Sequence, residues 1–135
     1  DKEAMAKQAA AALAKLNPNF TDIERPVRDM SGGQRQAIAI ARAIHFNVRL
    51  LVMDEPTAAL GPHETAQVEE LIRRLKGKGI AILLGSHDVR SVIDLADRIV
   101  VLKNGKKVGE VDAPSATEDS IVDFIVRGSA REVAA

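Results

Sequence analysis

Two short and mainly apolar runs, at residues 49–53 and 80–84, mark the centre of the chain. Each has the length and content of a strand that is buried in a parallel sheet. Residues 62–76 lie between them and carry apolar side chains at helical spacing, and a further core-facing helix is expected around residues 92–95. Strand, helix, strand and helix in this order predict an α/β fold with a parallel sheet.

Before the first run, the pattern predicts two helices joined by an irregular connector. Residues 2–16 are rich in strong helix formers, and Asn17-Pro18-Asn19 then ends the helix. Residues 20–29 show no clear period, and a second helix is expected from Ser31 to about residue 46. Ser31 is suited to cap this helix, because its hydroxyl oxygen can accept a hydrogen bond from a backbone N–H group.

The last third of the chain predicts a β-hairpin and a final helix. Residues 98–102 and 107–111 flank Asn104-Gly105, the dipeptide preferred in two-residue type I′ turns. An amphipathic helix is expected at residues 118–126, and the tail from Gly128 is expected to fray.

Composition excludes several classes of function. Lys and Arg total 19 and Asp and Glu total 19 among 135 residues, so no net charge draws the chain to nucleic acid, and we expect no nucleic-acid partner. Cysteine is absent, which rules out disulfides and thiolate metal sites. No apolar run approaches the roughly 20 residues that span a bilayer. The sequence starts at Asp1 without a Met, and we therefore expect it to be a piece of a longer protein.

The first predicted strand ends in two acidic residues, Asp54 and Glu55, followed by Pro56. A nucleotide hydrolase needs such a pair, because one carboxylate can hold Mg²⁺ through water while the other orients the attacking water. The same pair could instead only solvate the end of a strand. Taken alone, the two acids leave both interpretations open.

Ser31, Gly32, Gly33 and Gln34 stand at the start of the second predicted helix. A hydroxyl, two positions that allow close backbone approach and the positive end of a helix dipole together suit the binding of a phosphate. The alternative is a serine N-cap that follows an irregular loop.

Three motifs in one order carry a family resemblance. Residues 30–36 read Met-Ser-Gly-Gly-Gln-Arg-Gln, residues 50–56 contain the apolar run with its acids, and Ser86-His87 follows the second run. In this order they resemble the signature motif, the Walker B strand and the switch histidine of ABC-type ATPases. Without this setting, the histidine would be interpreted as an ordinary surface or core residue.

The resemblance implies a role for each motif residue. Glu55 would polarise the attacking water and His87 would contact the γ-phosphate, which makes these two the catalytic residues. Asp54 would hold Mg²⁺ through water. The signature residues that would contact the γ-phosphate of ATP bound to a partner subunit are Ser31, Gly32, Gly33 and Gln34.

The resemblance also implies a partial P-loop NTPase-like parallel sheet with flanking helices, a helical signature-motif segment and a C-terminal β-hairpin. Residues 1–48 would form the signature segment and residues 49–135 the α/β core, both within one incomplete nucleotide-binding domain. The implied partners are a second ATP-binding subunit in a head-to-tail dimer, a transmembrane permease and, indirectly, a periplasmic or extracellular sugar-binding protein. The implied location is cytoplasmic, on the inner face of the membrane.

Three departures from the family pattern refine this expectation. Met30 replaces the commoner Leu, which conserves volume. Gly61 stands where most members carry Asp, and Thr57-Ala58-Ala59-Leu60-Gly61 resembles the variant of monosaccharide importers for ribose, xylose and fructose. No Gly-x-x-x-x-Gly-Lys-Ser/Thr occurs in the sequence, so the chain alone is expected to be unable to hold ATP.

Two other functions stay open at this point. The chain could be a non-catalytic folding or interaction module that keeps the motif residues without performing chemistry. It could also be an ABC-type ATPase of DNA repair or translation, although the balanced charge and the lack of a long heptad insertion argue against that.

Overall fold

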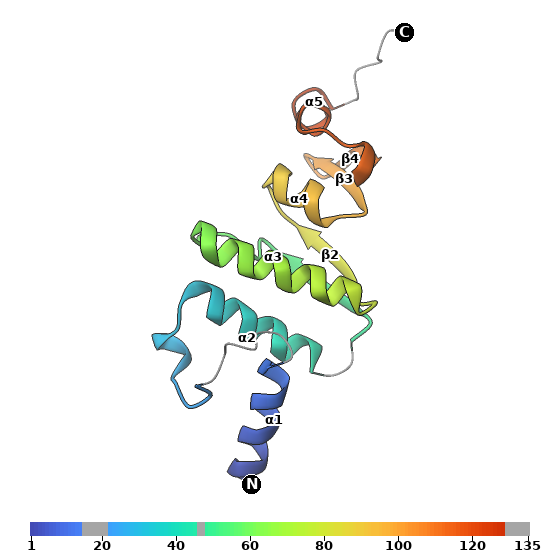
Figure 1. Ribbon diagram of the computed structural model, residues 1–135. Helices are drawn as coiled ribbons and strands as arrows, with labels where there is room; N and C mark the ends of the chain where they lie inside the picture. Colours follow the sequence, from blue (N-terminus) through green and yellow to red (C-terminus); the bar gives the residue numbers. More distant parts are fainter. Residues whose placement is uncertain (15–21, 46–47, 129–135) are drawn as a thin grey trace. The chain divides into compact units, whose positions relative to one another are not determined.

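The computed structural model describes residues 1–14, 22–45 and 48–128, and these form two compact units that divide after Gly85. Figure 1 labels the main elements. The first unit contains α1 (Lys2–Ala14), the 3₁₀ turn η1 (Val27–Asp29), α2 (Gly32–Ile44), β1 (Leu50–Asp54), α3 (Pro62–Gly77) and β2 (Ala81–Gly85). The second unit contains α4 (Val89–Leu95), β3 (Arg98–Lys103), β4 (Lys106–Asp112), the 3₁₀ turn η2 (Ala113–Ser115) and α5 (Glu118–Arg127).

The predicted order of helices and strands is confirmed. Most of the element ends that the structure describes differ from the predicted ones by one or two residues. The 3₁₀ turn at Val27–Asp29 interrupts the predicted irregular connector. Two predicted helix ends lie outside the described residues: the end of the first helix at Asn17-Pro18-Asn19 and the end of the second helix at Phe46.

Strands β1 and β2 are parallel neighbours, as predicted for two strands joined by one helix. Their register pairs Leu50 with Ala81 and Asp54 with Gly85. Helix α3 connects them and buries its predicted apolar face: Val68, Leu71, Ile72 and Leu75. Because a right-handed crossover returns the chain in the same direction, both strands present their carboxyl ends at one edge of the sheet.

The expectation that both strands are buried on both faces is wrong. Leu51 and Met53 are buried, but Leu50, Val52 and Leu83 keep 57%, 64% and 61% of their surface exposed. Side chains alternate across a strand, so these three residues occupy the face opposite the buried ones. Within the described residues, the helices cover a single face of this two-stranded sheet, which leaves an apolar face open.

Helices α2 and α3 lie side by side in the first unit, with their N-terminal ends together (Figure 1). The close contact is at Gly33, where an added Cβ would come within 3.1 Å of the Cβ of Glu64. Gly32 has a similar constraint, because a Cβ there would lie 2.6 Å from Cδ2 of Leu60. The two glycines therefore allow the helix starts to approach closely.

The second unit is built on the predicted hairpin. Asn104 and Gly105 form the turn between antiparallel β3 and β4, with φ angles of +50° and +74°. Positive φ at both central residues is the mark of a type I′ turn, which confirms the prediction. The core of this unit consists of Ile99, Val101, Ala113 and Ile121, against which residues of α4 and α5 pack.

The division into compact units after Gly85 falls elsewhere than the predicted segments 1–48 and 49–135. Packing between α2 and α3 joins the signature helix to the first strand pair. The assignment of both segments to one incomplete nucleotide-binding domain remains a prediction. No helix in the described ranges is long and apolar enough to cross a membrane.

Candidate functional site

The two acids Asp54 and Glu55 lie at the carboxyl end of β1, beside the end of β2. The backbone N–H of Glu55 donates to the carbonyl oxygen of Gly85 at 2.8 Å, which continues the ladder by one residue. An added Cβ on Gly85 would lie 3.1 Å from Oδ1 of Asp54, so the absence of a side chain leaves room beside this carboxylate. Ligand-binding residues of open α/β sheets gather at such an edge.

Glu55 has a left-handed backbone conformation, with φ of +47°. The following turn is closed by a hydrogen bond from Ala58 N to Glu55 O at 3.1 Å, and Ala59 again has positive φ, +59°. Left-handed backbone is unfavourable for residues other than glycine, and strained positions of this kind concentrate at functional sites. The geometry therefore distinguishes Glu55 from an ordinary acid at a strand end.

The carboxylates at this edge suit a cation whose remaining ligands are supplied by water or by a nucleotide. No cluster of three or more His, Cys, Asp or Glu that could enclose a metal occurs among the described residues. Mg²⁺ is ordinarily held by one or two carboxylates together with waters and phosphate oxygens. Asp54, exposed and with open space on the Gly85 side, fits this role.

Ser31 is the N-cap of α2 and forms a capping box with Gln34. Its Oγ accepts from the Gln34 backbone N–H at 3.3 Å, and the Gln34 Oε1 accepts from the Ser31 N–H at 3.0 Å. The N-cap interpretation from the sequence is thus confirmed, but it does not exclude phosphate binding. Ser31 is exposed, and the bond from Gln34 uses an oxygen lone pair, so the hydroxyl can still donate one hydrogen bond to an anion.

Glu64, on the first turn of α3, is the residue that sequence reasoning missed. Its carboxylate accepts from the Gly61 backbone N–H at 3.2 Å. This bond, together with hydrogen bonds from the Ser31 hydroxyl and the Gly33 N–H and the charge of Arg35, holds the pKa of Glu64 below its usual range. The sequence signal that could have revealed it is a Glu three residues after a helix start at Gly61-Pro62.

His87 belongs to the second unit, two residues after the end of β2. It stands in a short turn before α4, where the Asp88 N–H donates to Ser86 Oγ at 3.1 Å. Asp88 caps α4 by accepting from the N–H groups of Arg90 and Ser91.

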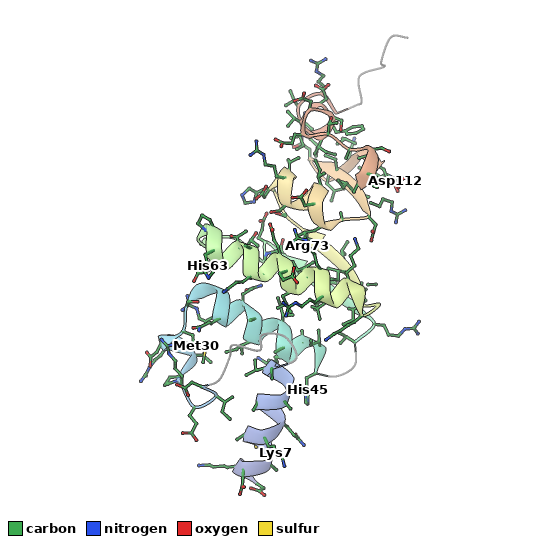
Figure 2. All side chains as sticks on the ribbon, viewed as in Figure 1. Lys7, Met30, His45, His63, Arg73 and Asp112 are labelled. Atoms are coloured by element: carbon green, nitrogen blue, oxygen red, sulfur yellow. The ribbon has the colours of Figure 1, made fainter. Side chains whose placement is uncertain are left out.

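Three other residues of the first unit behave as ordinary structural positions (Figure 2). Met30 retains only 5% of its surface, so its apolar bulk packs as the commoner Leu would. His45, the C-cap of α2, and His63, on the first turn of α3, are both exposed. The His63 ring is 3.1 Å from the Gln67 amide nitrogen, a contact along one helix.

Comparison with known proteins shows which family this chain resembles. Residues 1–58, which include the signature motif and the Asp54-Glu55 strand, match the family described as ABC transporter. The ATP-binding cassette MJ1267 of an ABC transporter aligns with a TM-score of 0.73 at 28% identity, over 90% of this chain and 47% of its own. The dimeric cassette MJ0796 in a post-hydrolysis state, bound to ADP and Pi, aligns with a TM-score of 0.66 at 30% identity, over 84% of this chain and 49% of its own. The chain is thus similar to the ATP-binding cassettes of ABC transporters.

Within that family the chain is similar to proteins of sugar import. The xylose/arabinose import ATP-binding protein of Sulfolobus acidocaldarius is 43% identical, over 78% of this chain and 42% of that protein. The fructose import ATP-binding protein of Rhizobium meliloti is 40% identical, over 93% of this chain and 48% of that protein. The chain thus spans about half the length of these relatives or less.

Proposed function

We propose that this chain supplies the signature helix and the hydrolytic carboxylate of an ATPase that powers import of a simple sugar. The observation that carries the proposal is the end of β1. There Glu55, in a left-handed conformation, follows Asp54 and is bonded to the end of the neighbouring parallel strand. The names of the sugar-import relatives support the choice of substrate class.

The proposed roles follow from the chemistry of the side chains. The Glu55 carboxylate orients and polarises the attacking water, and Asp54 holds Mg²⁺ through water. His87 contacts the γ-phosphate as a hydrogen-bond donor. The start of α2 offers the Ser31 hydroxyl and backbone N–H groups to the γ-phosphate of ATP on a partner subunit. The residues of this second surface are Ser31, Gly32, Gly33 and Gln34.

This division of labour requires partners. A second ATP-binding subunit in a head-to-tail dimer brings its nucleotide to the signature helix, and the dimeric MJ0796 cassette supports the presence of a second subunit. A transmembrane permease on the inner face of the membrane would couple hydrolysis to transport, with a sugar-binding protein acting on the outer side. The sequence contains no Gly-x-x-x-x-Gly-Lys-Ser/Thr loop, so the isolated chain is proposed to be inactive.

A hybrid cassette tests the proposal. In it, the part of the Rhizobium meliloti fructose import relative that this chain matches is replaced by this chain. We expect the hybrid to hydrolyse ATP and Glu55→Gln to reduce turnover at least about a hundredfold, the size typical of lost general-base or positioning chemistry. Ser31→Arg should also abolish turnover, since its bulk blocks the partner's phosphate.

Glu70→Gln is the matched control, because it removes one carboxylate from α3, where Glu70 pairs with Arg74 on the surface. Its turnover should equal that of the unmodified hybrid. Full turnover in the Glu55→Gln or Ser31→Arg hybrid would refute the assigned roles.

A further inference from the structure

Residues 55–60, here called the Glu55 turn, follow the carboxyl end of β1, and hydrogen bonds restrict their backbone. The Ala58 N–H donates to the carbonyl oxygen of Glu55 at 3.1 Å. The Leu60 N–H donates to the carbonyl oxygen of Thr57 at 3.2 Å, so the two bonded turns overlap. Because these bonds join successive parts of a five-residue stretch, they fix the position of Leu60 relative to Glu55.

The side chain of Leu60 reaches from the Glu55 turn to the first residue of α2. An added Cβ on Gly32 would lie 2.6 Å from Cδ2 of Leu60, so this methyl group occupies the space that a side chain on Gly32 would need. Leu60 is half-buried, as is Gly32. Glycine at this position therefore allows a direct contact between the turn that begins at the proposed hydrolytic carboxylate and the helix that carries the signature motif.

This contact is distinct from the packing of helix α3 on helix α2. The helices meet at Gly33, where an added Cβ would lie 3.1 Å from Cβ of Glu64. Leu60 precedes α3, which begins at Pro62, and thus belongs to the turn rather than to the helix. Closely packed groups transmit displacement, because no free space absorbs it. A movement of the start of α2 would therefore move Leu60 and, through the bonded turns, the backbone of Glu55.

We propose that Leu60 is a positioning residue that couples the two proposed nucleotide surfaces of this chain. When a partner's phosphate binds at the start of α2, Leu60 is displaced and shifts the water-orienting carboxylate of Glu55. The proposal rests on the proposed function of Ser31 to Gln34 and of Glu55. A displacement of about 1 Å can change a catalytic rate by about a hundredfold, so a small movement of α2 is enough. Hydrolysis at Glu55 then depends on occupation of the signature helix of the same chain.

The test is a titration of the whole 135-residue chain, labelled with ¹⁵N, with inorganic tripolyphosphate at neutral pH. The amide signals of Ser31 to Gln34 report binding at the start of α2, and those of Ala58 and Ala59 report the Glu55 turn. In the unmodified chain we expect both groups of signals to shift with the same Kd. In Leu60→Ala, which removes the contacting methyl group, we expect the first group still to shift and the response of the second group to be lost.

Three further variants complete the experiment. Leu60→Met conserves apolar volume and should keep the response of the Glu55 turn. Leu102→Ala makes the same substitution as Leu60→Ala at a leucine of β3 that is 69% exposed, and it should leave both groups of signals responding as in the unmodified chain. Leu60→Val, which lacks δ carbons, takes the place of the alanine variant if that variant does not fold.

The outcomes separate this inference from the function on which it rests. The coupling would be overturned, with the phosphate surface intact, if Ser31 to Gln34 shift and the Glu55 turn does not. It would also be overturned if the turn still responds in Leu60→Ala, or if Leu102→Ala removes the response as well. If tripolyphosphate shifts none of the amides at the start of α2 in any variant, that start is not a phosphate site, and both proposals are wrong.

Discussion

At the scale of single residues, Gly109 on β4 has the least room of the glycines in the second unit. An added Cβ would lie 2.4 Å from a ring carbon of Phe124 on α5, closer than carbon atoms can approach. Gly109→Ala must therefore displace the ring, and we expect a loss of about 1–3 kcal/mol, the usual cost of overpacking. Chemical denaturation followed by circular dichroism measures it.

Gly77→Ala is the control for that substitution, because Gly77 ends α3 and a Cβ there meets nothing within 4 Å. It should be neutral or slightly stabilising, since alanine favours helix over glycine. If Gly109→Ala is as stable as Gly77→Ala, α5 does not pack on β4 as described.

Glu64 also predicts how stability depends on pH. Its folded-state pKa is lowered from the ordinary value of 4.5, first by the Gly61 N–H and then by the Ser31 hydroxyl, the Gly33 N–H and Arg35. A group whose pKa is lowered on folding stabilises the fold fully above its unfolded pKa. This contribution should decline as the pH falls below 4.5 and vanish below the lowered folded-state pKa.

Urea midpoints measured from neutral to acidic pH would show this effect as a steeper acid loss in the unmodified chain than in Glu64→Gln. Glu110, whose pKa is lowered by Lys107 and then Arg98, contributes in the same direction and should account for part of the dependence that remains. Identical pH profiles for the two chains would contradict the contacts assigned to Glu64.

The residues that could be predicted from the sequence are those whose chemistry is local. Asp54 and Glu55 end a strand, and Ser31 begins a helix, so adjacent residues are enough to place them. The contact between Glu64 and Gly33 joins two helices that are separate in sequence. This contact depends on how α2 packs on α3, and hydrophobic periodicity does not reveal which residues of two helices face each other.

At the scale of elements, the periodicity of the sequence predicted each strand and helix but misjudged how the strands are covered. A continuous apolar run indicates burial on both faces only if the chain also supplies layers for both. Here the described helices protect Leu51 and Met53, while Leu50, Val52 and Leu83 stay exposed. The periodicity of a strand cannot reveal whether its second face has a partner.

The open apolar face of β1 and β2 predicts self-association of the chain in solution. The two-stranded sheet has no further strand among the described residues, and exposed apolar strands are templates for pairing. Val52→Lys with Leu83→Lys should lower the average mass measured by sedimentation at high concentration. Met5→Lys, at a side chain 68% exposed on α1, is the matched control and should leave association unchanged. A monodisperse monomer for the unmodified chain would contradict this prediction.

At the scale of the whole molecule, the fold class and the family follow from the sequence, and the comparisons support both. The order of the three motifs was sufficient to predict both, because the spacing of the motifs is set by the strands and helices that carry them. The proposed joint action of Glu55 and His87 cannot be predicted from local pattern, since these residues lie in different compact units. Local pattern places each residue in its own unit and gives no distance between the two.

The central claim is that this chain carries the carboxylate and the signature helix for hydrolysis but not the loop that holds the β- and γ-phosphates. Calorimetric titration of Mg-ATP into the isolated chain, and into the hybrid cassette carrying Glu55→Gln, tests it directly. We predict no saturable binding by the isolated chain and saturable binding without turnover by the hybrid, because the amide removes only the charge that orients water. Saturable binding of Mg-ATP by the isolated chain at low micromolar concentration would contradict the claim.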